Sequence, residues 1–196
     1  MKQPRTIVFA SHNSHKVEEM RRICGPAFNI VSLADIGCHT DIPEEGATLA
    51  ENAEAKAMWV YRHYGLECFA DDTGLEVDAL DGAPGVHTAR FAGPECDSAA
   101  NVDLLLHKLC GARVRTARFR TVIAHVSSDG DIRRFDGVAE GSIATERLGS
   151  AGFGYDPVFV PAGHTRSFAQ MAPDEKNAIS HRGRATALLK EFLNNL

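Results

Sequence analysis

The first third of the chain alternates apolar and polar blocks in an order that predicts a strand, a loop, a helix and a second strand. Residues 6–10 form an apolar run typical of a buried strand. The polar residues 11–16 follow at once, and Val17, Met20 and Cys24 then recur at helical spacing. A second strand is expected over residues 28–33.

A capping box opens the next helix. Thr48 is followed three residues later by Glu51, the pattern in which two side chains satisfy backbone N–H groups at the start of a helix. The positions expected on the inner face of this helix are Ala53, Ala57, Val60 and Tyr64. Residues 67–71 then predict a strand that ends at a turn.

The second half predicts two helices and a hairpin. Asp97 or Ser98 caps the first helix, and Ser180 caps the terminal one. Their expected inner positions are Val102, Leu105, Leu106 and Leu109 in the first, and Ala185, Leu188, Leu189 and Phe192 in the second. Residues 116–127 and 132–140 are typical of an antiparallel hairpin, and the glycine-rich residues 149–157 lead to a short strand. The fold class expected is α/β, a mixed β-sheet flanked by helices.

The composition is that of an ordinary globular protein. The 196 residues are 44% hydrophobic and 24% charged, with nothing resembling a linker, so we expect one bilobed domain over residues 1–196. The net charge of -5 argues against nucleic acid or an anionic membrane as the main partner. The apolar run at residues 7–10 is too short for a signal sequence or a membrane span, and the five cysteines lack metal-ligand spacing. A cytoplasmic protein with reduced thiols is the simplest expectation.

Two adjacent carboxylates are the most informative candidates for chemistry. Asp71 and Asp72 follow an apolar run and precede Gly74. Successive side chains of a strand point to opposite faces, so the two can face one ligand only if the strand ends between them, and one of them is expected to be structural. The segment also fits an ordinary Asx turn.

Two segments are candidate anion sites. In the first loop Asn13 can cap the following helix, which leaves backbone N–H groups and Lys16 to face a phosphate, although a capped surface helix explains the segment equally well. Residues 175–182 place cations in the first turn of the last helix, where they oppose the helix dipole unless an anion compensates; a solvated basic turn is the alternative. His12 and His15 have the spacing of metal ligands but lie in a loop.

Residues 152–157 combine two glycines with two aromatic side chains. Phe153 and Tyr155 can stack on a planar ligand that the glycines allow to approach, but tight core packing explains them as well. With the acid pairs at residues 44–45 and 71–72, and the cations Lys16, Lys56, Lys176, His181 and Arg182, the chain has the residues of a magnesium-dependent phosphoryl-transfer site.

Seven motifs occur in order along the chain: Ser11-x-Asn13-x-x-Lys16, Glu44-x-Gly46-x-Thr48, Glu51-Asn52-Ala53 with Lys56, Ala70-Asp71-Asp72-Thr73-Gly74-Leu75, Gly82-Ala83-Pro84-Gly85 through Ala89-Arg90, Phe153-Gly154-Tyr155-Asp156-Pro157, and Glu175-Lys176-x-x-x-Ser180-His181-Arg182. Together they resemble the inosine triphosphate pyrophosphatase family, whose members hydrolyse nucleoside triphosphates bearing nonstandard purines. The departures are Ser11 for the usual Thr, Thr73 where Ser is common, and Leu49 where Phe is common. None removes a proposed catalytic group.

The resemblance implies a homodimer in which each subunit has two lobes around a central nucleotide cleft. It implies that Glu44 and Asp72 engage Mg²⁺, and that Asp72 accepts a proton from the water that attacks the α-phosphorus, so that pyrophosphate leaves. The triphosphate contacts it implies are Ser11, His12, Asn13, Ser14, His15, Lys16, Lys56 and Lys176. The contacts it implies around the purine and nearby are Phe153 stacked on the ring, Asp156, His181 and Arg182 at its edge, and Thr73, Gly154 and Tyr155.

The expected substrates are ITP, dITP and XTP, and the cationic pair His181 and Arg182 motivates a hypothesis for their selection. Hypoxanthine and xanthine carry an acceptor oxygen at C6, where adenine carries an amino donor. A buried donor that faces this amino group has no acceptor to bind. Such a mismatch can lower the catalytic efficiency with the adenine nucleotide by ~10⁴ or more. The alternatives are a Maf-like pyrophosphatase acting on modified pyrimidine or methylated nucleotides, and a nucleotide-binding module without catalysis.

Overall fold

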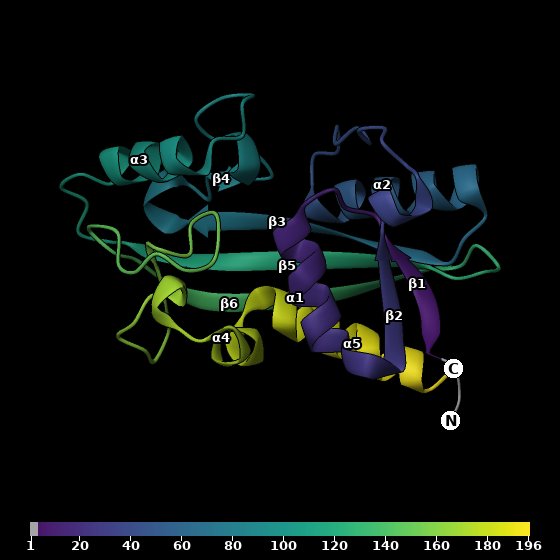
Figure 1. Cartoon of the computed structure of the whole chain (residues 1–196). Helices are drawn as coiled ribbons and strands as arrows, with labels where there is room; N and C mark the ends of the chain where they lie inside the picture. Colours follow the sequence, from purple (N-terminus) through teal and green to yellow (C-terminus); the bar gives the residue numbers. More distant parts are fainter. Residues whose placement is uncertain (1–3) are drawn as a thin grey trace. The chain divides into compact units, whose positions relative to one another are not determined.

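The computed structural model describes residues 4–196, which form two compact units. Unit 1 consists of the chain up to Asp72 with Thr121–Gly137 and Arg182–Leu196, and unit 2 consists of Thr73–Arg120 and Val138–His181. The strands are β1 (Arg5–Phe9), β2 (Phe28–Ser32), β3 (Cys68–Val77), β4 (Pro84–Gly85), β5 (Thr116–Val126), β6 (Ile132–Ile143) and β7 (Phe159–Pro161) (Figure 1). The helices are α1 (Ser14–Cys24), α2 (Leu49–Tyr64), α3 (Ser98–Lys108), α4 (Pro173–Ile179) and α5 (His181–Asn194).

The strands form one sheet in the order β2-β1-β3-β5-β6-β7, with β4 on β3. Strand β1 pairs in parallel with β2 and β3, whereas β3 with β4 and β6 with β7 are antiparallel. The expected mixed α/β fold is therefore confirmed. The chain passes from one unit to the other within β3, β5 and β6.

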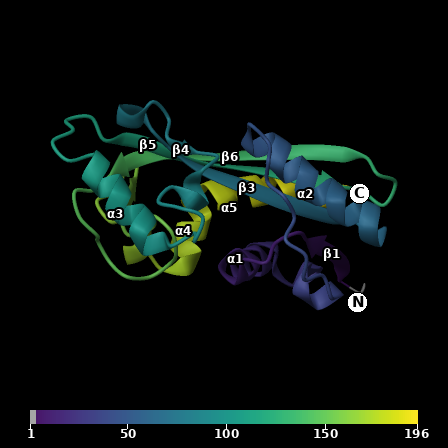
Figure 2. The ribbon, with the colours of Figure 1, turned by 90° about the horizontal axis from the view of Figure 1, so that it is seen from above.

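The core of unit 1 lies where α1 and α5 pack on the strands. Met20 of α1 and Leu189 of α5 are fully buried against Phe9 and Phe69 of the sheet. The two helices lie next to each other in both ribbon views, and the Thr186 hydroxyl of α5 lies 3.1 Å from the Met20 sulfur of α1 (Figures 1 and 2). Helix α2 packs on the opposite face, where the Cys68 thiol donates to the Ala57 carbonyl. Because successive side chains of a strand point to opposite faces, β3 contacts α2 on one face and α1 and α5 on the other.

Unit 2 has its own core between α3 and the strand segments of that unit. Leu105 of α3 packs with Leu75, Phe119 and Phe159 of the strands and with Phe168 of a short 3₁₀ turn. Phe119 and Phe159 have ring centroids 4.7 Å apart. Asp97 caps α3 by accepting from two backbone N–H groups, so of the two expected caps it is the one used.

Three sequence expectations about packing are wrong. Tyr64 and Leu188 are 37% and 46% exposed instead of inward, because Gly65 ends α2 next to Tyr64 and the apolar stripe of α5 is narrower than expected. Lys176 does not lie in the first turn of the last helix. It belongs to α4, a separate helix that ends at Ile179, before Ser180 adopts an extended conformation. No helix within residues 4–196 is long and apolar enough to cross a membrane.

Candidate functional site

Strand β3 carries both central carboxylates, Asp71 and Asp72, and extends beyond the end that the sequence predicted for it. It continues through Asp71 and Asp72 to Val77, because Leu75 and Glu76 pair with β4 beyond them. The expectation of a turn at Asp72 is therefore wrong. The unbroken alternation places Asp71 on the face of α1 and α5 and Asp72 on the face of α2.

Asp71 lies in a buried ion cluster. Lys16 Nζ lies 2.9 Å from Oδ1, Arg182 Nε lies 3.2 Å from Oδ2, and the Asp71 side chain is 1% exposed. Burial opposes ionisation of Asp71, but Lys16, Arg182 and Lys56 outweigh it and hold its pKa well below the usual range. Arg182 also pairs with Glu19 at 2.6 Å. These contacts join β3 to α1 and α5, which is the structural role expected of one of the two aspartates.

Asp72 has a different environment on the opposite face of β3. Asn52 Nδ2 donates to its Oδ2 at 3.0 Å, and Lys56 Nζ lies 4.0 Å from its Oδ1. Burial raises the pKa of Asp72 despite Lys56 and Asn52. Two adjacent residues of one strand thus differ in the direction of their pKa shifts. Both carboxylates are buried, but nearby cations outweigh burial at Asp71, whereas Lys56 and Asn52 do not outweigh it at Asp72.

Lys56 connects the two candidate metal ligands. Its ammonium donates to the Glu44 carboxylate and, at 2.7 Å, to the backbone carbonyl of Asp71. Burial lowers its pKa, but Asp72, Glu44 and Asp71 outweigh burial and raise it, so Lys56 remains charged. The capping box of Thr48 and Glu51 is present and fixes the helix start that sets the position of Lys56.

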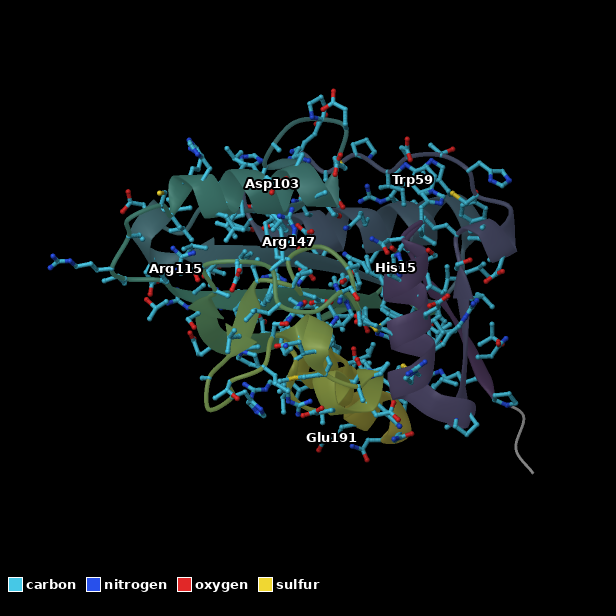
Figure 3. The ribbon with its side chains drawn as sticks, turned by 60° about the vertical axis from the view of Figure 1, so that its left-hand side comes forward. His15, Trp59, Asp103, Arg115, Arg147 and Glu191 are labelled. Carbon is cyan, nitrogen blue, oxygen red and sulfur yellow. The ribbon has the colours of Figure 1, made fainter. Side chains whose placement is uncertain are left out.

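Residues 12–15, at the N-terminus of α1, are exposed. Asn13 caps the helix by accepting from the Lys16 N–H at 3.1 Å, and the Ser11 hydroxyl accepts from the Asn13 N–H at 3.2 Å. His12 Nε2 lies 3.1 Å from the Thr40 carbonyl, and His15 lies on α1 (Figure 3). The first turn carries no acidic residue, so its dipole favours an anion.

Glu44 and Asp72 are the carboxylates of unit 1 that could take part in holding a metal ion. Within residues 4–196 no group of three or more His, Cys, Asp or Glu side chains could hold a metal ion by itself. Glu44 and Asp72 both approach the Lys56 ammonium, so the chain provides two carboxylates around one positive charge. Magnesium typically takes one or two protein carboxylates and completes its octahedron with phosphate oxygens and water.

In unit 2, Asp156 organises the aromatic segment. Its Oδ2 accepts from the Phe153 N–H at 2.9 Å and from Lys176 Nζ at 2.7 Å. The Lys176 ammonium lies 5.0 Å from the centre of the Phe153 ring. Gly152 has a φ of +76°, and a Cβ there would lie 2.1 Å from Asp156 Oδ2, so the turn requires glycine.

Two other candidates in unit 2, Tyr155 and His181, contact groups of the protein core. Tyr155 is buried and its hydroxyl donates to the Thr88 carbonyl at 2.9 Å. Its pKa is raised by burial. His181 stacks on Phe119 with ring centroids 4.4 Å apart.

The candidate residues thus divide into two clusters. In unit 1 the structure places Ser11, His12, Asn13, Ser14, His15, Lys16, Glu44, Lys56, Asp72 and Arg182. In unit 2 it places Thr73, Phe153, Gly154, Tyr155, Asp156, Lys176 and His181. Lys176, expected on the triphosphate, contacts Asp156, and Arg182, expected at the base, pairs with Asp71 and Glu19. The roles of individual residues remain predictions.

Asn52, to which the sequence pattern gave no role, contacts both Gly46 and Asp72. The signal was its position one helical turn before Lys56, on the buried face of α2. An amide and an ammonium on the apolar face of a helix require polar partners, which indicates a site.

Fold and side-chain clusters together define an α/β protein with two buried aspartates and a buried lysine in unit 1. The model of the Ham1 family matches residues 7–192, and the chain belongs to this family. A dITP/XTP pyrophosphatase of Porphyromonas gingivalis is 54% identical over 188 residues, covering 95% of this chain and 96% of its own. One of Christiangramia forsetii is 50% identical over 187 residues, covering 95% and 98%.

Solved structures match the whole fold as well. The Ham1 protein of Staphylococcus aureus has a TM-score of 0.87 at 36% identity, covering 97% of this chain and 99% of its own. A HAM1 protein from Coxiella burnetii also has a TM-score of 0.87, at 38% identity, covering 98% and 100%.

Proposed function

We propose that this protein hydrolyses nonstandard purine nucleoside triphosphates, namely ITP, dITP and XTP, to the nucleoside monophosphate and pyrophosphate. The relatives named as dITP/XTP pyrophosphatases support this substrate class. The observation that carries it in the structure is the pair Glu44 and Asp72 around Lys56. The Maf-like alternative has no support in these relatives.

For the reaction, we assign the triphosphate to Lys16, Lys56 and the exposed donors of residues 11–15. The helix N-terminus and the two ammonium groups neutralise phosphate charge, which is the main requirement of phosphoryl transfer. Glu44 and Asp72 would hold Mg²⁺, which when bound screens the charge of the phosphate oxygens.

Asp72 acts as the general base. Its carboxylate takes a proton from a water molecule as the water oxygen bonds to the α-phosphorus, and the bond from the α-phosphorus to the bridging oxygen breaks. Pyrophosphate carries away the electron pair of that bond, so no other reactant is needed.

For base recognition we propose the residues of unit 2. Phe153 stacks on the purine, and Asp156 holds both the Phe153 backbone and Lys176. We include Lys176 here and not with the triphosphate because its ammonium lies against Asp156 and the Phe153 ring. His181 is a further candidate donor to the C6 oxygen. We do not assign Arg182 to a direct contact with the base, because its guanidinium pairs with Asp71 and Glu19.

We further propose that the protein is a cytoplasmic homodimer that does not bind nucleic acid. The net charge of -5 supports the last point, because a nucleic-acid surface needs excess positive charge.

The test is turnover of ITP, dITP, XTP, ATP and GTP with magnesium, with pyrophosphate resolved from orthophosphate. We expect pyrophosphate from the first three substrates and a large loss of kcat in Asp72→Asn. Orthophosphate as the main product, or an Asp72→Asn variant as fast as the wild type, would contradict the proposal. Binding without turnover would favour the non-catalytic module.

A further inference from the structure

Asn52 is a buried amide with two specific partners in unit 1. It is 1% exposed and lies in the second turn of α2. Its Oδ1 accepts from the Gly46 N–H at 2.7 Å, and its Nδ2 donates to Asp72 Oδ2 at 3.0 Å. Asparagine is a poor helix former compared with alanine or leucine, so local propensity does not explain its presence there.

The Gly46 contact fixes the orientation of the Asn52 amide. A backbone N–H can only donate, so the side-chain oxygen must face Gly46 and the NH₂ group must face Asp72. The approach is close: a Cβ on Gly46 would lie 2.7 Å from Asn52 Oδ1 and 2.8 Å from the Glu51 Cβ. Gly46 therefore allows the backbone to reach the amide at a distance that another residue would obstruct.

The same amide holds Asp72 in one orientation. Because Nδ2 binds Oδ2, the other carboxylate oxygen, Oδ1, is the one 4.0 Å from the Lys56 ammonium. Lys56 follows Asn52 by one helical turn and donates to Glu44. Asn52 and Lys56, on one face of α2, therefore each contact both Asp72 and the loop that contains Glu44 and Gly46.

We propose that Asn52 is a positioning residue that sets the orientation of the Asp72 carboxylate relative to Glu44. The proposal rests on the proposed function, because it concerns the residue assigned there as the general base. Misplacing a reacting group by about 1 Å can cost about 100-fold in rate, so loss of this contact should lower kcat by that order. KM should change little, since the hydrogen bonds of Asn52 go to Gly46 and Asp72, which are not among the residues assigned to the triphosphate.

Two substitutions separate the two contacts of Asn52. In Asn52→Asp the new carboxylate still accepts from the Gly46 N–H but no longer donates to Asp72. Asn52→Leu has a similar volume, carries no charge and removes both contacts. We expect kcat for dITP to fall about 100-fold in both variants. Hydrogen exchange of the Gly46 amide in the metal-free, nucleotide-free protein should stay slow in Asn52→Asp and become fast in Asn52→Leu.

Asn101 offers a matched control within unit 2. It is 2% exposed, accepts from the Ala92 N–H at 2.6 Å and donates to the Ala89 carbonyl at 2.8 Å. Asn101→Asp therefore disturbs the same kind of buried clamp without touching Asp72. It should lower the melting temperature and leave kcat of the folded enzyme unchanged.

The outcomes are distinguishable. Wild-type kcat in Asn52→Asp with a loss in Asn52→Leu would mean that Asn52 acts only through the loop, and would overturn the proposal. An equal loss of kcat in Asn101→Asp would overturn it as well. If the wild-type protein itself releases no pyrophosphate, the proposed function fails instead.

A measurement on proteins that keep Asn52 covers the case in which its variants do not fold. The side-chain NH₂ resonances of Asn52 should shift between the wild type and Asp72→Asn, because the acceptor loses its charge. Unshifted resonances would show that the Nδ2 contact is not formed in solution and would overturn the proposal.

Discussion

Asp71→Asn should destabilise the protein strongly although the change alters the shape of the side chain little. The variant leaves Lys16 and Arg182 without their shared carboxylate, and the side chains of these cations are only 16% and 3% exposed. Removing one partner of a buried ion pair typically costs about 3–5 kcal/mol, because the other charge stays buried. Glu19 still neutralises Arg182, so we expect the lower end, about 3 kcal/mol.

The assay is urea and thermal unfolding followed by circular dichroism. At about 2–4 °C per kcal/mol for a chain of this size, a loss of 3 kcal/mol lowers the melting temperature by about 6–12 °C. Asp103→Asn is the matched control, because its ion pair with Arg147 has side chains 68% and 40% exposed (Figure 3). Exposed pairs contribute about 0–1 kcal/mol. An Asp71→Asn variant no less stable than Asp103→Asn would refute the structural role of Asp71.

Three further predictions follow from the same structure. A carboxyl whose pKa is lowered by folding stabilises the folded protein at pH values above its unfolded-state pKa of about 3.9, and this stabilisation is lost as the pH falls through the folded-state pKa. The difference in unfolding free energy between the wild type and Asp71→Asn should therefore persist at neutral pH and shrink below about pH 4, as measured by urea unfolding at a series of pH values. Burial raises the pKa of the Cys24 thiol to about 11 and that of the Cys68 thiol to about 12. Iodoacetamide at pH 8 should therefore label the exposed Cys96 and Cys110 and leave Cys24 and Cys68 unlabelled, and rapid labelling of Cys24 or Cys68 in the native protein would contradict their burial. Gly152→Ala forces a strained φ and places a Cβ 2.1 Å from Asp156 Oδ2, so it must displace the buried Asp156–Lys176 pair. KM for dITP should rise and the melting temperature should fall, and an unchanged KM in the folded variant would argue against a base site there.

The parts of the fold that follow local rules could be predicted from the sequence. The capping box at Thr48, the Asp97 cap and the apolar spacing of α1 each depend on a few neighbouring residues, and all three are present. The ends of strands depend on distant partners. Strand β3 outlasts its apolar run because β4 pairs with it, which no local pattern around Asp72 reveals.

The start of helix α4 is marked by residues that lie next to one another in the sequence. Pro173 occupies the start of the helix and Asp174 and Glu175 follow in its first turn, a typical helix beginning. The prediction of a single helix was wrong because Lys176 stands near the basic residues at the start of α5, although it belongs to α4. The distribution of site residues between clusters depends on tertiary packing: Arg182 and Lys176 have similar charge, but one pairs with Asp71 and the other with Asp156.

The central claim is that water attacks the α-phosphorus. The most direct test is hydrolysis of dITP in ¹⁸O-labelled water, with the products separated and their masses measured by mass spectrometry. Attack on the α-phosphorus with pyrophosphate leaving predicts one ¹⁸O atom in the nucleoside monophosphate and none in pyrophosphate. Label in pyrophosphate, or in orthophosphate, would contradict the reaction assigned to Asp72 and its neighbours.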